Sequence, residues 1–158
     1  MAFISWESSL SIGVNIIDEQ HKQIIYYINE LHSLLSNDKF SSSIATSPTL
    51  KGKVKNILDE LVNYTITHFA FEEDMMQKAN YQSLEAHKKV HKSFIDKVKN
   101  YQDRFERGED IAQEVLDTLK SWLTNHIKRE DKDYSIPVNN FLNKKTGWFS
   151  SAFKKFFG

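Results

Sequence analysis

The chain has 158 residues, with 21 Lys and Arg against 21 Asp and Glu, which is enough length for one domain with a substantial core. The balanced charge gives no general attraction for nucleic acid, so no nucleic-acid partner is expected. The absence of cysteine excludes disulfides, thiolate metal sites and iron–sulfur clusters. Five glycines and two prolines interrupt the chain rarely, which favours helices over a fold of strands and turns.

The N-terminal sequence "MAFISWESSL" lacks the basic start and apolar run of a secretory signal. No apolar stretch approaches the roughly 18 residues that a membrane-spanning helix needs. A cytoplasmic location is therefore the expectation.

The first helical segment is predicted to begin after Asp18 as its N-cap. His21 is in phase with the apolar stripe of this segment, which consists of Ile24, Ile28, Leu31 and Leu35. A polar loop over residues 37–47 follows. Ser47 and Pro48 then have the pattern of an N-cap followed by proline at the first helical position.

The second and third segments carry the longest stripes. The stripe of the second contains Val54, Ile57, Leu58, Leu61, Thr65, His68 and Glu72. The sequence "KANYQS" ends it. The third alternates spacings of three and four residues, as in a heptad seam, through Leu84, His87, His91, Phe94, Val98, Tyr101 and Phe105. A turn is predicted at Gly108.

The fourth segment has an apolar stripe with His126 and Asp131 near the same side. The stripe consists of Val115, Leu116, Leu119, Leu123 and Ile127. Four such stripes joined by short or moderate loops predict an all-α fold, an up-down-up-down four-helix bundle over residues 1–142.

Each inward stripe carries at least one histidine, and two also carry a carboxylate. A lone histidine on an apolar face is usually a core residue bonded to a carbonyl, and His32 is assigned no function on this ground. A larger group needs another explanation, because each unpaired buried polar group costs about 1–3 kcal/mol. The group that predicts a bound cation is His21, His68, Glu72, His87, His91, His126 and Asp131.

The spacing of these residues supports a metal site. His87 and His91 are four residues apart, so both rings can reach one metal from a single helix face. His126 and Asp131 are five apart, which is about 140° around an ideal helix. Asp131 must therefore reach around the helix, or the helix must widen there into a π-type turn.

Five imidazoles and two carboxylates exceed what one metal ion accepts. Divided over two ions, they leave the carboxylates free to bridge and at least one coordination position open. Iron, zinc, copper and manganese all suit imidazole with carboxylate, and the count alone does not choose among them.

The motifs resemble those of the hemerythrin family, and of its single-domain bacterial branch in particular. "HFAFEE" fits H-F-x-x-E-E, "HKKVH" fits H-x-x-x-H, "HIKRED" fits H-x-x-x-x-D, and "IDEQHK" resembles the segment around the first histidine. The resemblance implies two non-heme irons with an oxo or hydroxo bridge. It also implies ligand roles: one iron is held by His87, His91 and His126, the other by His21 and His68, and both are bridged by Glu72 and Asp131.

The resemblance implies reversible O2 binding at the open iron, so that the protein is an oxygen carrier, store or local supplier and not an enzyme. "WLTNHI" matches the family's W-L-x-x-H-I. The expected O2 pocket is lined by Trp122, Leu123, Ile127, Phe69 and Ile24. One alternative is an oxygen or redox sensor, although such domains are often attached to signalling modules for which this chain leaves no room. Another is a diiron enzyme that consumes O2, peroxide or nitric oxide.

Residues 143–158, "NKKTGWFSSAFKKFFG", add four lysines, no acid and five aromatic residues. A helix over this tail divides into two faces. The apolar face consists of Trp148, Phe149, Ala152, Phe153, Phe156 and Phe157. The polar face consists of Ser150, Ser151, Lys154 and Lys155. This division predicts an amphipathic helix that docks on a partner or on the inner membrane surface, with folding back over the bundle as the alternative.

Overall fold

The computed structural model describes residues 2–36, 48–144 and 146–158, and its regular elements within these ranges are helical. The elements are η1 (Ser8–Leu10), α1 (Asn15–Ser36), α3 (Pro48–Lys78), α4 (Leu84–Glu106), α5 (Ala112–His126), η2 (Ile127–Asp131), α6 (Ser135–Lys144) and α7 (Thr146–Phe157). Among these helices, none is both long and apolar enough to cross a membrane.

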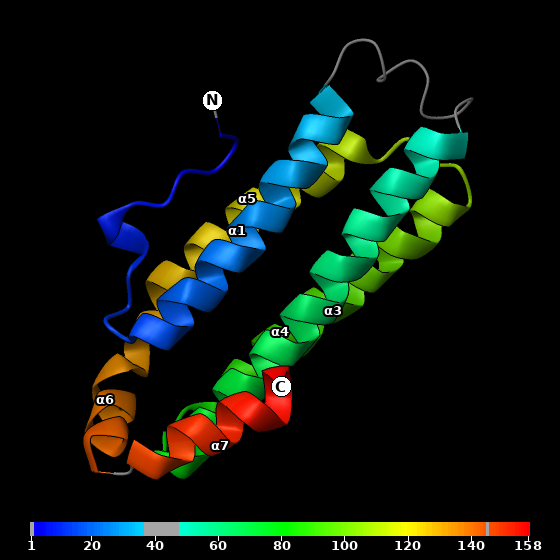
Figure 1. Ribbon diagram of the computed structural model, residues 1–158. Coiled ribbons are helices and arrows are strands. Elements are labelled where there is room, and N and C mark those ends of the chain that lie inside the picture. Colours follow the sequence, from blue (N-terminus) through cyan, green and yellow to red (C-terminus); the bar gives the residue numbers. More distant parts are fainter. Residues whose placement is uncertain (1, 37–47, 145) are drawn as a thin grey trace.

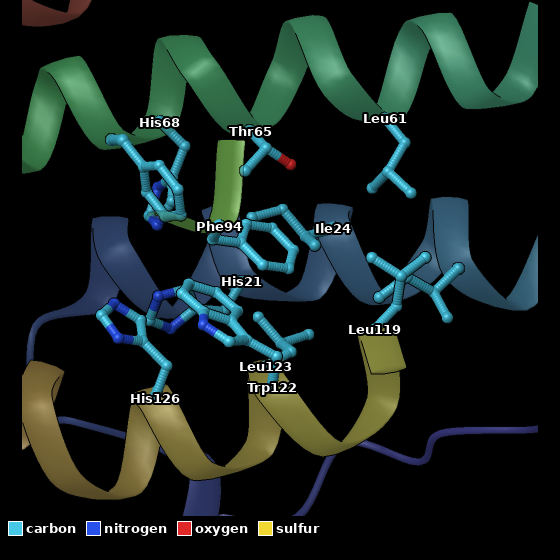
Figure 2. Close-up of a pocket in the computed structure, with 12 residues that line it drawn as sticks. His21, Ile24, Leu61, Thr65, His68, Phe94, Leu119, Trp122, Leu123 and His126 are labelled. Atoms are coloured by element: carbon cyan, nitrogen blue, oxygen red, sulfur yellow. The ribbon is translucent and has the colours of Figure 1, made fainter. Parts of the chain in front are cut away.

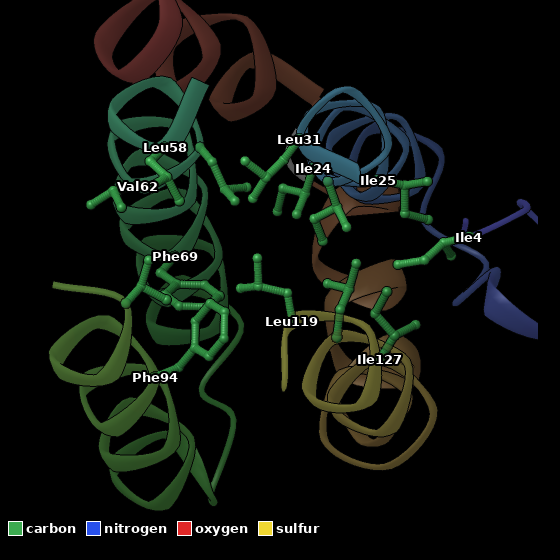
Figure 3. Packing of buried hydrophobic residues seen from close by; sticks show 14 of the residues in the cluster. Ile4, Ile24, Ile25, Leu31, Leu58, Val62, Phe69, Phe94, Leu119 and Ile127 are labelled. Carbon is green, nitrogen blue, oxygen red and sulfur yellow. The ribbon is translucent and has the colours of Figure 1, made fainter. Parts of the chain in front are cut away.

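Four long helices, α1, α3, α4 and α5, lie side by side and form the predicted bundle (Figure 1). The stripes read from the sequence meet along its axis and make one apolar core (Figure 3). Leu31, Leu61 and Leu119 are among its fully buried members. The alternation of apolar and polar residues therefore places the histidines of the same stripes inside the bundle.

The helix boundaries agree with the sequence in part. Pro48 is the first residue of α3, as predicted, while Ser47 and the loop over residues 37–47 lie outside the described residues. The N-cap prediction at Asp18 is wrong, because α1 already begins at Asn15. The Asp18 carboxylate instead accepts hydrogen bonds from Ser11 Oγ at 2.5 Å and from the Ile12 backbone N–H at 2.9 Å. It thereby ties the N-terminal segment to α1.

One residue in the left-handed conformation lies just beyond the end of α3, and another lies just beyond the end of α4. Gly108 has φ +86° beyond the end of α4, and Asn80 has φ +57° beyond the end of α3. In both turns the next backbone N–H bonds back to the last helical turn, from Glu109 to Arg104 and from Tyr81 to Met76. These are Schellman motifs, which satisfy carbonyls at the helix end. They turn the chain sharply enough for α3, α4 and α5 to be neighbours in the bundle.

The tail forms the predicted helix, and it packs against α3 (Figure 1). The rings of Trp148, Phe156 and Phe157 lie 5.6–5.9 Å from that of Phe71. The Trp148 indole N–H donates to Asp74 Oδ2 at 3.2 Å. Of the two arrangements considered from the sequence, the structure has the one in which the aromatic face folds back on the bundle.

Part of the tail stays at the surface. Phe153 is 44% exposed, and Lys154 and Lys155 are exposed beside it. The side chain of Phe149 falls outside the described part of the chain. The division at residue 142 stays a prediction, and α6 ends at Lys144.

Candidate metal centre

The structure brings all seven predicted ligand residues together at one level of the bundle. Their side chains come from four helices and a π turn, and each is at most 3% exposed. The elements contribute as follows: His21 from α1, His68 and Glu72 from α3, His87 and His91 from α4, His126 from α5 and Asp131 from η2.

Of the two arrangements considered for His126 and Asp131, the structure has the π turn, over Ile127–Asp131. A π turn pairs residues five apart along the backbone rather than four, so it brings Asp131 back to the face of His126. The Asp131 Oδ1 atom lies 3.0 Å from His126 Nε2. The local widening of the helix thus adds a carboxylate to the group.

Three histidines surround one oxygen of each carboxylate, and we call this group the three-histidine side. His87 Nε2 and His126 Nε2 lie 3.1 and 3.0 Å from Asp131 Oδ1. His91 Nε2 lies 3.2 Å from Glu72 Oε2 and 3.2 Å from His126 Nε2. Five ligand atoms therefore converge on a small volume.

The other carboxylate oxygens face His21 and His68, which form the two-histidine side. His21 Nε2 lies 3.1 Å from Asp131 Oδ2 and 3.6 Å from Glu72 Oε1. His68 Nε2 lies 3.3 Å from the same oxygen of Glu72. Because Glu72 and Asp131 each direct one oxygen to each side, both carboxylates are placed to bridge two cations.

The polar atoms of the group are better placed to bind cations than to form hydrogen bonds with one another. Despite these short distances, several buried atoms have no hydrogen bond of acceptable geometry within the described chain. They include Nε2 of His21, His68 and His87, Oε2 of Glu72, and both carboxylate oxygens of Asp131. Such atoms cost stability unless something compensates them, and imidazole with carboxylate is a donor set for iron and related metals.

Without a cation, bound protons supply the positive charge. Burial alone lowers the pKa of His21, but the carboxylates of Asp131 and Glu72 outweigh it and raise that pKa to about 9. Burial is likewise outweighed at His91, where Glu72 and Glu73 raise the pKa to about 9. At His68 burial dominates, and its pKa is lowered.

The two carboxyl groups stay ionised over the ordinary pH range. Burial raises the pKa of Glu72, but its interactions with His68, His21 and His91 hold it well below its usual value. Burial and Glu72 raise the pKa of Asp131, and His126 and His21 reverse this, so that it too lies well below its usual value. The site is thus charged and ready to bind a cation once its imidazole protons leave.

An outer layer of polar side chains orients the imidazoles, and the sequence reasoning missed it. Gln20 Oε1 lies 2.6 Å from His68 Nδ1, and Glu73 Oε2 lies 3.2 Å from His91 Nδ1. An Nδ1–H that donates to such an oxygen leaves the Nε2 lone pair for a metal. Gln20 and Glu73 each adjoin a predicted ligand in the sequence, which is a signal that could have found them.

Glu130 and Tyr134 complete this outer layer. Glu130 Oε2 lies 3.4 Å from His126 Nδ1. The Tyr134 hydroxyl is fully buried and donates to Glu72 Oε1 at 2.7 Å. Burial and the nearby carboxylates raise the pKa of Tyr134 well above its usual value, so the hydroxyl keeps its proton.

A small cavity lies next to the two-histidine side (Figure 2). Its volume, counted over positions where the centre of a water molecule fits, is about 10 Å³. That is room for about one molecule the size of water. The residues that line it are His21, Ile24, Ile28, Leu61, Thr65, His68, Phe69, Phe94, Leu119, Trp122, Leu123 and His126.

Four of the five predicted pocket residues line this cavity: Ile24, Phe69, Trp122 and Leu123. Ile127 does not line it and is instead a fully buried member of the apolar core (Figure 3). It follows His126 directly, so its side chain points about 100° away around the helix.

The family model "Hemerythrin HHE cation binding domain" matches residues 12–135. The chain belongs to the hemerythrin family. It is 39% identical to a bacteriohemerythrin of Stenotrophomonas maltophilia over the whole of both chains. It is 30% identical to a bacteriohemerythrin of Methylococcus capsulatus over 85% of this chain and 95% of that protein. A solved structure of wild-type hemerythrin superposes with a TM-score of 0.75 and 28% identity, covering 87% of this chain and 98% of that one.

Proposed function

We propose that this hemerythrin binds O2 reversibly at a diiron centre and acts as an oxygen carrier, store or local supplier. The observation that supports this best is the unequal division of the histidines around two carboxylates placed to bridge. A cavity for one small molecule lies beside the side with fewer histidines. An iron with fewer protein ligands keeps a coordination position for a small ligand.

The distances support the ligand assignment that the resemblance implies. His87, His91 and His126 would hold one iron and leave it saturated. His21 and His68 would hold the other. The bridging ligands would be Glu72 and Asp131. When bound, the two irons would supply the electrons that reversible O2 binding requires.

The chain itself keeps the open side dry. Leu119, Leu123 and Ile24 line the cavity with aliphatic groups, and the rings of Phe69 and Trp122 close it. The Phe69 ring stacks on that of His91 with centroids 3.7 Å apart, which fixes both. Excluding water and protons slows the side reactions that would oxidise the irons irreversibly.

The donor set favours a carrier over a diiron enzyme. Five neutral imidazoles and two carboxylates stabilise high oxidation states less than the carboxylate-rich sites of ferritin-like di-iron proteins do. A sensor or an O2-consuming enzyme stays the alternative. The rate of irreversible oxidation separates them, because a carrier keeps its oxygenated form for long periods and the others lose it quickly.

The direct test is to load the full chain with iron and record its absorption spectrum before and after exposure to air. We expect two irons per chain and a new charge-transfer band that disappears when O2 is removed. A protein from iron-replete cells that holds one tightly bound zinc and no iron contradicts the proposal.

A cytoplasmic location and a membrane contact through the tail stay predictions from the sequence. Phe153, Lys154 and Lys155 offer one exposed aromatic ring and two cations for such a contact. Deletion of residues 146–158 should lower thermal stability, because it uncovers Phe71. Phe153→Ser is the stability control, since it changes a partly exposed ring of the tail and leaves Phe71 covered. If neither variant changes co-sedimentation with anionic vesicles, the tail serves only the fold.

A further inference from the structure

Thr65 has a buried hydroxyl group beside the cavity. It lies on α3, three residues before His68 and on the same helix face. Its side chain is 4% exposed and lines the cavity, and Figure 2 shows it pointing from α3 into the space between the helices. Its Oγ1 atom has no hydrogen-bond partner in the described chain.

Two other threonines satisfy their hydroxyls within their own helices. Thr67 Oγ1 donates to the Asn63 carbonyl at 3.0 Å, and Thr124 Oγ1 donates to the Lys120 carbonyl at 2.8 Å. This bond to the carbonyl four residues earlier is the usual solution for threonine in a helix. Thr65 does not make it. Valine would fill the same space without a buried unpaired hydroxyl, so packing alone does not account for threonine here.

The rest of the cavity wall offers little to a polar ligand. Thr65 carries the only hydroxyl among the lining side chains, and most of the others are aliphatic or aromatic. Trp122 stacks its ring on Phe94 and His126, with centroids 3.6 and 4.4 Å apart. The imidazoles that line the cavity are those assigned to the metals. A ligand in this space therefore meets one hydroxyl among apolar groups.

We propose that the Thr65 hydroxyl donates a hydrogen bond to the small, negatively charged ligand that binds on the two-histidine side. This inference rests on the proposed diiron centre. A ligand that carries or acquires negative charge at the open iron accepts a strong hydrogen bond from such a donor. The bond also selects ligands that have an acceptor atom within reach of Thr65, rather than any molecule small enough for the cavity.

The test measures azide binding to the oxidised, iron-loaded full chain by absorption spectroscopy. Thr65→Val should weaken azide binding about ten- to a hundredfold, the usual effect of removing a hydrogen bond to a charged group. Thr65→Ser keeps the hydroxyl and should retain most of the affinity. Thr67→Val is the matched control two residues away, and it should bind azide as the unchanged chain does.

Thermal unfolding of the metal-free variants gives a readout independent of the irons. Thr65→Val should be at least as stable as the unchanged protein, because no hydrogen bond is lost. Thr65→Val that binds azide as tightly as the unchanged protein overturns the inference. A structural role is indicated instead if Thr65→Val loses stability without metal and Thr65→Ser weakens azide binding as much as Thr65→Val does, and this result also overturns the inference. An unchanged chain that binds two irons but no azide also overturns it. Failure to bind two irons contradicts the proposed function itself.

Discussion

The three-histidine side and the two-histidine side share Glu72 and Asp131. They differ in the side chains that surround their imidazoles. On the three-histidine side, carboxylates lie behind two of the imidazoles, with Glu73 3.2 Å from His91 Nδ1. On the two-histidine side, the neutral amide of Gln20 lies behind His68, and apolar groups form a cavity. The difference supports the proposal that one side would hold its metal firmly and the other would leave part of its metal accessible.

Removing a ligand from the three-histidine side should have the largest effect. His91→Ala removes an imidazole that lies 3.2 Å from a carboxylate oxygen of buried Glu72 and 3.2 Å from one of partly buried Glu73. We expect loss of the iron pair and a decrease in unfolding free energy of about 3–5 kcal/mol. Iron analysis and thermal unfolding measure both. His32→Ala is the control, since His32 is half-buried and stacks on Phe3 away from the ligands. Two retained irons in His91→Ala would show that this side does not anchor the metals.

The metal-free protein should lose stability as pH rises from about 6.5 to above 9. The pKa values of His21 and His91 are about 9 in the folded chain against 6.5 for the free side chain. In that window the folded state binds more protons than the unfolded state, so the unfolding free energy falls with pH. Since both imidazoles must lose protons to bind metal, metal affinity should rise over the same window.

Thermal unfolding with and without zinc as a redox-inert probe measures the two trends. His21 on the two-histidine side and His91 on the three-histidine side each have a raised pKa. Metal binding in this pH window should therefore release two protons. A pH-independent melting temperature of the metal-free chain contradicts the charge arrangement described above.

Loss of the Tyr134 hydroxyl should act on the two-histidine side first. Tyr134 donates to Glu72 Oε1, the oxygen that also lies 3.3 Å from His68 Nε2. Tyr134→Phe should lower the unfolding free energy by about 1.5–3 kcal/mol, the range for hydrogen bonds to charged groups. Iron should then be lost more readily from the two-histidine side. Tyr101→Phe, which removes a bond to Thr118 Oγ1 among neutral groups, should cost less and leave the iron content unchanged.

The smallest expected effect concerns the cavity wall. Leu123→Asn should keep both irons but shorten the lifetime of the oxygenated protein by about tenfold, equivalent to about 1.4 kcal/mol, because a polar wall admits water and protons. Absorbance decay in air measures this lifetime. Leu116→Asn is the control, as Leu116 is buried but does not line the cavity. Equal decay in both variants removes the argument for a dry cavity.

The sequence by itself determined the features that depend on local periodicity. The apolar stripes predicted the bundle, and residues four apart such as His87 and His91 share a face in any helix. The spacing of His126 and Asp131 predicted either that Asp131 reaches around the helix or that the helix widens into a π turn, because no ordinary helix brings residues five apart onto one face, and the structure has the π turn. These predictions need only the geometry of a single helix.

Only the tertiary structure decided which side chains meet across the bundle. Tyr134 and Glu72 are 62 residues apart, and His68 and Gln20 are 48 apart, so no local pattern joins them. The tail shows the same limit: its amphipathic pattern was readable, but its partner was not. Burying an apolar helix face against any apolar surface is favourable. The surface of α3 that carries Phe71, which the tail covers, exists only once the bundle has formed.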